Sequence, residues 1–356
     1  MRIAFVALLS DKKLEQKLAA LQSLDEVRRI DLFRRFPFHG AKIHWVRIPV
    51  AIRRSKYASN LWRLGALLGL GWRYDLIVGC HQEYHGVLAW LAGWLWRRPV
   101  IQVVTGGVDW VCERRLQRWA LWGANGCGVR GSIAAQRLRA WGYRGPVEVL
   151  ANPMVTEVSD ANQRLEPTYH LAVVGDLAPE KGYPWMLEVL ARVRSQLPDL
   201  RVGIAASATF QEKLAPAIDR SCLRANLDLL GRQDEAGLAR LYRSSRALLL
   251  SSCSEGLPQV VLEAMTYGLP VFVTAVGEVP WLVRDGVEGR IVPYGETEAM
   301  TAALVAGLTN PDALEQMGRC ARARIASLRE QFTVPAIAAA WRRLLLAACP
   351  DMMDRN

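Results

Sequence analysis

The sequence predicts an α/β protein built from two doubly wound, mostly parallel sheets. Three observations support this fold class. The 356 residues exceed what one core usually holds, short apolar runs alternate with segments of helical period, and this alternation stops once, at Thr156–Tyr169, before it begins again. Strands that alternate with helices form parallel sheets covered on both faces. We therefore expect a first domain over residues 1–160, a second over 168–333, and a last helix over 334–356 that packs back on the first domain.

In the first half, strands are expected where short apolar runs recur: Arg2–Leu8, Val27–Phe33, Ile43–Ile48, Asp75–Gly79, Val100–Val104 and Val147–Leu150. Helices are expected where apolar residues recur every three or four positions: Lys12–Leu24, Ile52–Leu70, Gly86–Trp96 and Ser132–Trp141. The eleven apolar residues of Gly86–Trp96 are too few to span a bilayer, which needs about 20. We expect a buried helix there.

The second half repeats the pattern after a polar stretch that contains a proline and is typical of a linker, Thr156–Tyr169. Its predicted strands are His170–Val174, Arg201–Ala205, Leu227–Leu230, Ala247–Leu250 and Pro270–Thr274. Its predicted helices are Tyr183–Gln196, Glu235–Ser244, Pro258–Tyr267 and Val334–Ala348.

Composition indicates a well-cored soluble protein, because apolar residues make up 51% of the chain and charged residues 22%. The seven cysteines are odd in number and form no Cys-x-x-Cys pair, which argues against a disulfide framework or a zinc site. A reducing cytoplasm is the expected location. Met1–Ser10 is too short for a signal peptide and is better interpreted as the first strand.

The net charge of +11 is unevenly spread along the chain. Residues 1–160 hold 24 Lys and Arg against 12 Asp and Glu, a net of +12, and the remainder holds 21 against 22, a net of −1. Ten of the 13 tryptophans also lie in the first half. This predicts an anionic partner for the first domain, such as an anionic membrane surface or a lipid-linked acceptor. No nucleic-acid motif accompanies the charge.

The basic residues that we expect to form the docking cluster are Arg28, Arg29, Arg34, Arg35, Arg53, Arg54 and Lys56. The alternative is that these charges are dispersed and only keep the protein soluble.

The stretch Ser254–Pro293 carries the clearest chemical signal. Pro258 suits the first turn of a helix, and a helix that starts just after a parallel strand directs free N–H groups toward the crevice where anions bind. Glu255 precedes this helix and Glu263 lies inside it. Carboxylates on either side of a phosphate site accept hydrogen bonds from hydroxyl groups. The alternative is a solvated loop glutamate and a first-turn acid favoured by the helix dipole.

This stretch resembles the signature of the retaining GT-B glycosyltransferases of family 4, which is two glutamates separated by seven residues within EGLP-x-V-x-LEAM-x-x-G-x-PV. The preceding Leu227–Ser252 resembles the segment that leads into that signature, and VVGDLAPEKG, from Val173, resembles the start of the family's C-terminal domain. VEVLANPM, ending at Met154, resembles the end of its N-terminal domain. The resemblance implies two Rossmann-like domains facing across a cleft. It also implies transfer of a sugar from a nucleoside diphosphate to an acceptor in glycan, polysaccharide or glycolipid synthesis.

The resemblance also implies roles for individual residues. The implied catalytic residues are His81, Lys181 and Glu255. The implied donor-binding residues are Gly175, Lys181, Arg232, Glu255, Gly256, Leu257, Pro258 and Glu263. Among them, Lys181 would bind the diphosphate, Glu255 the sugar and Glu263 the ribose. The residues expected on the acceptor side are Ser10, His85, Thr105, Gly106 and Gly107. The competing interpretations are a non-catalytic nucleotide-sugar-binding subunit and another GT-B activity such as an epimerase.

The sequence departs from the family pattern at two places. Asp176 stands where members often carry a diphosphate-binding arginine, so Arg232 is expected to help instead. The family's N-terminal Gly-Gly loop is absent, because the first strand runs into LLSDKKLE. The chain has no Asp-x-Asp pair, so no metal is expected. The nucleotide-sugar donor is expected to act as a substrate, without a cofactor. We expect a cytoplasmic protein that associates peripherally with the inner face of the membrane.

Overall fold

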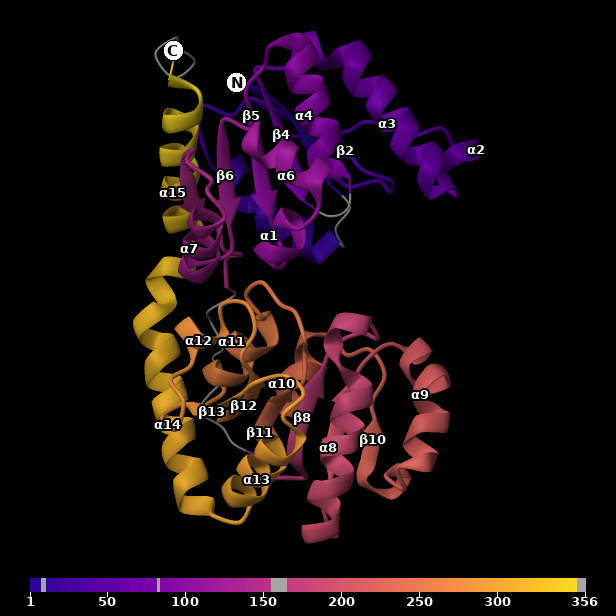
Figure 1. Cartoon of the computed structure of the whole chain (residues 1–356), viewed down its shortest axis with the longest axis vertical. Coiled ribbons are helices and arrows are strands. Elements are labelled where there is room, and N and C mark those ends of the chain that lie inside the picture. Colours follow the sequence, from indigo (N-terminus) through magenta and orange to yellow (C-terminus); the bar gives the residue numbers. More distant parts are fainter. Residues whose placement is uncertain (8–10, 82–83, 155–164, 351–356) are drawn as a thin grey trace. The chain divides into compact units, whose positions relative to one another are not determined.

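The computed structural model describes residues 1–7, 11–81, 84–154 and 165–350. The chain forms two compact units (Figure 1). The first unit contains Met1–Met154 together with Glu330–Asn356, and the second contains Val155–Arg329. Each unit holds one sheet in which every strand pair is parallel. Two doubly wound α/β units were predicted, and the fold class is confirmed.

The sheet of the first unit has seven strands. Their spatial order is β3 (Ile43–Trp45), β2 (Arg29–Phe33), β1 (Arg2–Val6), β4 (Leu76–His81), β5 (Val100–Val104), β6 (Gly126–Val129) and β7 (Val147–Val149). The chain first moves outward from β1 to β3 and then returns to add β4 on the other side of β1. The carboxyl ends of β1 and β4 therefore flank a topological switch point, where open α/β sheets bind ligands.

Helices cover both faces of this sheet. One face packs on α1 (Asp11–Gln22) and α15 (Val334–Ala348). The other packs on α3 (Lys56–Leu70) and α4 (His85–Trp96). The remaining helices of the first unit are α2 (Val50–Arg53), η1 (Gly71–Arg73), α5 (Val108–Cys112), α6 (Arg115–Trp122) and α7 (Ser132–Ala140).

The sheet of the second unit has six strands. Their order is β10 (Leu227–Leu229), β9 (Val202–Ala205), β8 (Tyr169–Val174), β11 (Ser245–Leu250), β12 (Val271–Thr274) and β13 (Gly289–Val292). The switch point lies between β8 and β11. The helices of this unit are η2 (Pro179–Lys181), α8 (Tyr183–Gln196), α9 (Ala208–Arg220), η3 (Arg224–Asn226), α10 (Glu235–Arg243), α11 (Gln259–Thr266), α12 (Val279–Leu282), α13 (Thr297–Leu308) and α14 (Pro311–Leu328). The short η4 (Arg329–Phe332) joins α14 to α15.

Several elements differ from their sequence-based prediction. The predicted helix Ile52–Leu70 is two helices, because Ser55 caps α3 by accepting a hydrogen bond from the Ala58 amide at 3.2 Å. Pro258 is the N-cap of α11 and lies just before its first turn. The helix around Gly86–Trp96 is buried only over its first part, since the Trp94 side chain is 72% exposed.

Two further observations bear on the character of the chain. All seven cysteines are free thiols. Over the described parts of the chain, no helix combines the length and the apolar composition needed to cross a membrane.

Candidate active site

The predicted donor residues of the second unit collect at the carboxyl ends of β8 and β11. Gly175 and η2, which ends with Lys181, follow β8, and the loop that contains Glu255 follows β11. These two strands are neighbours with Ala247 opposite Leu171, so both loops leave the sheet at its switch point.

Lys181 and Glu255 are in direct contact in this crevice. The Lys181 ammonium lies 2.7 Å from Glu255 Oε1, and the Ser252 hydroxyl donates to the same oxygen at 2.8 Å. The two side chains are only 24% and 14% exposed, so the ion pair is partly shielded from water. The site thus presents one cation and one acceptor carboxylate, which are the groups needed for a diphosphate and for sugar hydroxyls.

A close backbone approach holds this pair. Gly182 has a φ of +64°, and a Cβ there would lie 2.1 Å from the Ser251 carbonyl oxygen. The Ser251 hydroxyl donates to the Lys181 carbonyl at 2.9 Å, and the Cys253 amide donates to the Glu180 carbonyl at 2.8 Å. Only glycine permits that approach, so the sequence EKG fixes the position of the lysine.

The loop before α11 is tied from its other side as well. Gly277, with a φ of +54°, would place a Cβ 2.2 Å from the Gly256 carbonyl oxygen. The Glu278 amide donates to that carbonyl at 2.8 Å, and the Thr274 hydroxyl donates to the Ser252 carbonyl at 2.6 Å. Gly256, Leu257 and Pro258 are therefore held at the N-terminus of α11, whose first-turn amides favour an anion.

Glu263 lies on α11 and is positioned by a tyrosine that the sequence argument did not select. The hydroxyl of Tyr242, on α10, donates to Glu263 Oε2 at 2.9 Å. Tyr242 is buried and stacks on Tyr267 with ring centroids 5.5 Å apart. Burial, together with the nearby Glu263 carboxylate, raises the pKa of Tyr242, so its hydroxyl stays a donor. The only sequence signal was its place in the segment leading to the signature.

Asp176 and Arg232 form a second pair at this edge. Arg232 Nη2 lies 3.0 Å from Asp176 Oδ2, and Asp176 Oδ1 accepts from the Ser207 amide at 3.1 Å. Both side chains are exposed, at 76% for Arg232 and 57% for Asp176, so the pair contributes little to stability. Gly175 lies beneath the aliphatic part of Lys181, because a Cβ on it would be 3.6 Å from Lys181 Cε.

The predicted residues of the first unit also gather at strand ends. His81 ends β4 and pairs in register with Val104, so Thr105, Gly106 and Gly107 leave the neighbouring strand at the same edge. Ser10 lies outside the described residues.

His85 begins α4 and is buried. Its Nε2 lies 2.8 Å from Nη1 of the buried Arg63, another residue that the sequence argument missed. A guanidinium only donates, so Nε2 accepts and the imidazole carries its proton on Nδ1. Arg63 also donates to the Asn60 side chain at 2.7 Å.

The arginines chosen as a docking cluster are largely engaged within the first unit. Arg29 donates to Asp31 at 2.5 Å, and the buried Arg34 bonds to Asp11 at 2.7 Å. Arg35 donates to the backbone carbonyls of two other members of the cluster. Arg29 and Arg34 are thus paired with carboxylates, and the Arg35 guanidinium is held by backbone carbonyls.

Within the described ranges, no three His, Cys, Asp or Glu side chains gather closely enough to hold a metal ion. That the reaction needs no metal stays a prediction.

Comparison with known proteins places this site in a family. Residues 155–324 match the model of the glycosyl transferases group 1 family. The D-inositol 3-phosphate glycosyltransferase of Mycolicibacterium paratuberculosis is 30% identical over 181 residues, which cover 49% of this chain and 40% of that protein. The same enzyme of Mycobacterium avium is 30% identical over 49% of this chain and 42% of its own length. The chain thus spans less than half the length of these curated relatives.

Solved structures extend the similarity to both units. Sucrose-phosphate synthase from Thermosynechococcus elongatus superposes with a TM-score of 0.74 at 19% identity, covering 97% of this chain and 98% of its own. Anabaena HepE, solved with UDP and glucose, gives a TM-score of 0.72 at 17% identity, covering 97% of this chain and 99% of its own. Residues 155–324 therefore belong to the glycosyl transferases group 1 family, within a chain that has the GT-B fold across both of its units.

Proposed function

We propose that the protein is a retaining glycosyltransferase that moves a sugar from a nucleoside diphosphate to an acceptor. The observation that carries this proposal is the Lys181–Glu255 contact, held by the close backbone approaches of Gly182 and Gly277. The family match over this unit supports it.

The reaction breaks the bond between the anomeric carbon and the diphosphate oxygen and forms a bond from that carbon to an acceptor oxygen. The leaving nucleoside diphosphate keeps the electron pair and gains negative charge, and the proton of the acceptor hydroxyl passes to the leaving diphosphate oxygen. Lys181 and the first amides of α11 stabilise that charge where it develops. When the donor enters, the Lys181 ammonium turns to the diphosphate, and Glu255 accepts hydrogen bonds from the sugar.

Glu263, positioned by the Tyr242 hydroxyl, would accept hydrogen bonds from the ribose hydroxyls. Arg232, tethered to Asp176, would supply the second cation that family members place at position 176. With two cations and a helix N-terminus on the diphosphate, we propose that catalysis needs no metal.

The first unit would hold the acceptor at His81, His85 and Thr105–Gly107. Its surplus of arginine favours an anionic or lipid-linked acceptor, with the enzyme working at the cytoplasmic face of an anionic membrane.

A thermal-shift screen over UDP-, GDP- and ADP-sugars identifies the donor. A ligand at 100 times its dissociation constant stabilises the folded protein by about 2.7 kcal/mol. UDP-glucose is tested first, since HepE was solved with UDP-glucose. The donor found is then incubated without an acceptor, with and without EDTA. Slow hydrolysis that EDTA leaves unchanged supports a metal-independent enzyme.

A second candidate is a non-catalytic nucleotide-sugar-binding subunit, which the acidic residue at position 176 favours. That role predicts a thermal shift with a donor and no hydrolysis at all.

A further inference from the structure

The helix layer formed by α3, α4 and α6, together with the short η1 that follows α3, leaves many large apolar side chains in water. Helix α4 lies between the other two and contacts both. The exposed members, which we call the tryptophan face, are Tyr57, Leu61, Trp72, Trp94, Leu95, Trp96, Leu116 and Trp119. Trp94 is 72% exposed, Trp119 64% and Trp72 56%. A tryptophan offers ~150–250 Å² of burial, so several of them in one layer mark an interaction surface.

The chain that forms this face carries positive charge and no acidic residue. Residues 32–74, 84–108 and 114–147 contain neither Asp nor Glu. Arg73, Arg97 and Arg115 are exposed on these stretches. The surface that surrounds the tryptophans is therefore cationic, and its partner must be anionic.

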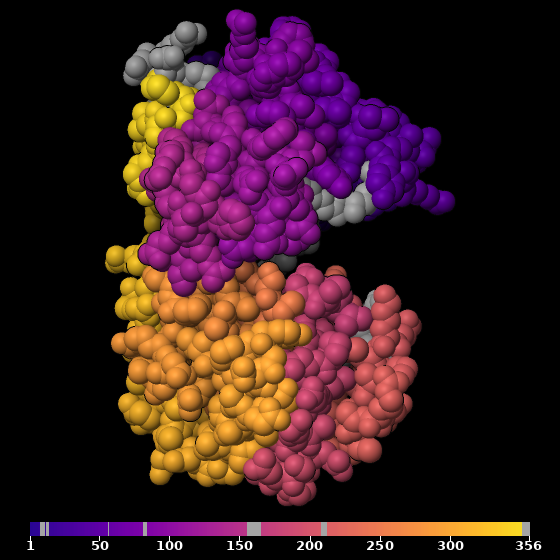
Figure 2. Space-filling view, viewed as in Figure 1, coloured from indigo at the N-terminus to yellow at the C-terminus, as the bar shows by residue number. Residues whose placement is uncertain are grey.

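Figure 2 shows the indigo-to-magenta part of the chain, which includes α3, α4 and α6, as most of the visible surface of the first unit. The face covers one side of the sheet, whereas the loops after β4 and β5 leave at its carboxyl edge. A partner seated on the tryptophan face would leave those loops open to an acceptor.

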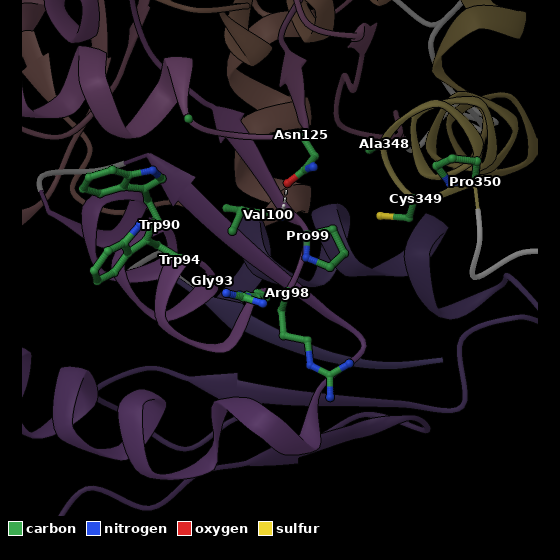
Figure 3. A pocket seen from close by; sticks show the side chains of 12 residues that line it. Trp90, Gly93, Trp94, Arg98, Pro99, Val100, Asn125, Ala348, Cys349 and Pro350 are labelled. Atoms are coloured by element: carbon green, nitrogen blue, oxygen red, sulfur yellow. Dashed lines mark hydrogen bonds between the residues drawn. The ribbon is translucent and has the colours of Figure 1, made fainter.

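A pocket of about 560 Å³ opens beside this face, between the end of α4 and the end of α15 (Figure 3). Trp90 and Trp94 line one side of it, and Cys349 and Pro350 the other. Arg98 also lines the pocket and donates from Nη2 to the Trp72 carbonyl at 2.8 Å. Its Nε is buried without a hydrogen-bond partner among the described residues. The pocket thus offers indole surface and a guanidinium, which suits a phosphate-bearing headgroup.

We propose that the tryptophan face is the surface by which this protein docks on an anionic lipid bilayer, with a lipid headgroup in the pocket beside α4. The proposal deepens the membrane part of the proposed function and rests on it for its biological setting. Tryptophan is enriched where a bilayer meets water, because the ring prefers the headgroup level. Basic residues near such a surface are attracted to anionic lipids.

The positive charge of the tryptophan face disfavours a dimer in which two copies of this face meet. A two-fold dimer would bring one arginine-bearing, acid-free surface against its own copy, and like charges would then be buried together. An anionic bilayer meets the same surface with complementary charge.

The test is co-sedimentation of the full chain with vesicles of phosphatidylcholine alone or with about 30% phosphatidylglycerol, at low and high salt. We expect at least tenfold stronger partitioning to the anionic vesicles, and weakening by salt because exposed charges are screened over about 8–10 Å. Indole fluorescence should shift to the blue as the rings leave water.

Two double variants locate the contact. Trp94→Ala with Trp119→Ala, and Arg73→Glu with Arg97→Glu, should each lower partitioning at least tenfold. The matched controls are Trp141→Ala, whose indole donates to Asp109 at 2.9 Å, and Arg192→Glu with Arg194→Glu in the second unit. These should partition like the unaltered protein. A thermal melt by circular dichroism verifies that each variant is folded.

No binding at low salt, equal binding to both vesicle types, or unchanged binding by both double variants would each overturn the proposal. A concentration-dependent dimer that the tryptophan variant abolishes would overturn it in favour of a second copy. None of these outcomes depends on sugar transfer, so a failed donor assay leaves the result intact.

Discussion

The second unit surrounds a tightly bonded polar crevice, whereas the first unit exposes apolar rings and positive charge. Of the eighteen exposed large apolar side chains among the described residues, fifteen lie in the first unit and three in the second. The net charge divides in the same way, since the first unit holds 27 Lys and Arg against 13 Asp and Glu, a net of +14, and the second holds 18 against 21, a net of −3. Two units of one architecture thus differ in the character of their surfaces, and the exposed apolar rings and the positive charge are concentrated on the first.

The largest expected effect tests whether the two units unfold independently of each other. Trp341 is 3% exposed on α15, in the core of the first unit. Replacing a buried tryptophan with alanine lowers the free energy of unfolding by about 3–5 kcal/mol. Hydrogen exchange should show faster opening of β1 and β6, with β8 and β11 unchanged. Arg342→Ala, on an exposed position of the same helix, is the control. Equal acceleration in both sheets would mean that the units unfold together.

Lys181→Ala should lower turnover by a factor on the order of 10²–10³, comparable to removing one preorganised donor at a developing charge. The reason is its place beside Glu255 at the switch point. Steady-state rates with the donor from the thermal-shift screen measure this. Lys213→Ala, an exposed lysine of the same unit, should keep full activity. Unaltered turnover in the Lys181 variant would show that another group neutralises the leaving diphosphate.

Glu263→Ala should weaken binding of the free nucleoside diphosphate by about 10–100-fold, because hydrogen bonds to a charged group contribute about 1.5–3 kcal/mol. Tyr242→Phe, which keeps the carboxylate but removes its hydrogen bond from the tyrosine, should weaken it less. Calorimetry measures both affinities, and Glu212→Ala is an exposed control. Equal affinity in all three variants, with normal melting, would remove Glu263 from the site.

Asp176→Arg should have the smallest effect and bind the donor at least as well as the unaltered protein. It loses the bond to the Ser207 amide but gains a cation at the diphosphate edge. Arg232→Ala should weaken donor binding, and the Asp176→Arg background should restore it. A clear loss of affinity in Asp176→Arg alone would show that the carboxylate has a positive role of its own.

Sequence patterns predicted the strands whose apolar residues are continuous, such as Val100–Val104, and the family signature that led to Glu255. They missed β6, whose sequence GCGV lacks β-branched residues apart from its end. Glycine is needed in this strand because side chains from other parts of the chain pack against its backbone. A Cβ at Gly126 would lie 2.9 Å from Leu344 Cδ1, and one at Gly128 would lie 2.3 Å from Leu150 Cδ1.

Two other omissions have related causes. β13 was missed because it is short and begins with Gly289, where a Cβ would lie 1.9 Å from the Val271 carbonyl oxygen. α9 was missed because Pro216 lies inside it. Arg63 and Tyr242 escaped notice because their importance comes from partners 22 and 21 residues away, which no local spacing reveals.

The packing of α15 in the first unit has a consequence for synthesis on the ribosome. The core that begins with Ile3 is completed only when Trp341 and Leu344 emerge, long after the whole second unit has been made. At about 5–20 residues per second, the first sheet waits for roughly 10–40 s with one face covered by α1 but not by α15. The second unit, although later in the chain, can finish folding first. The nascent first half, rich in tryptophan and arginine, is then the part most in need of a chaperone.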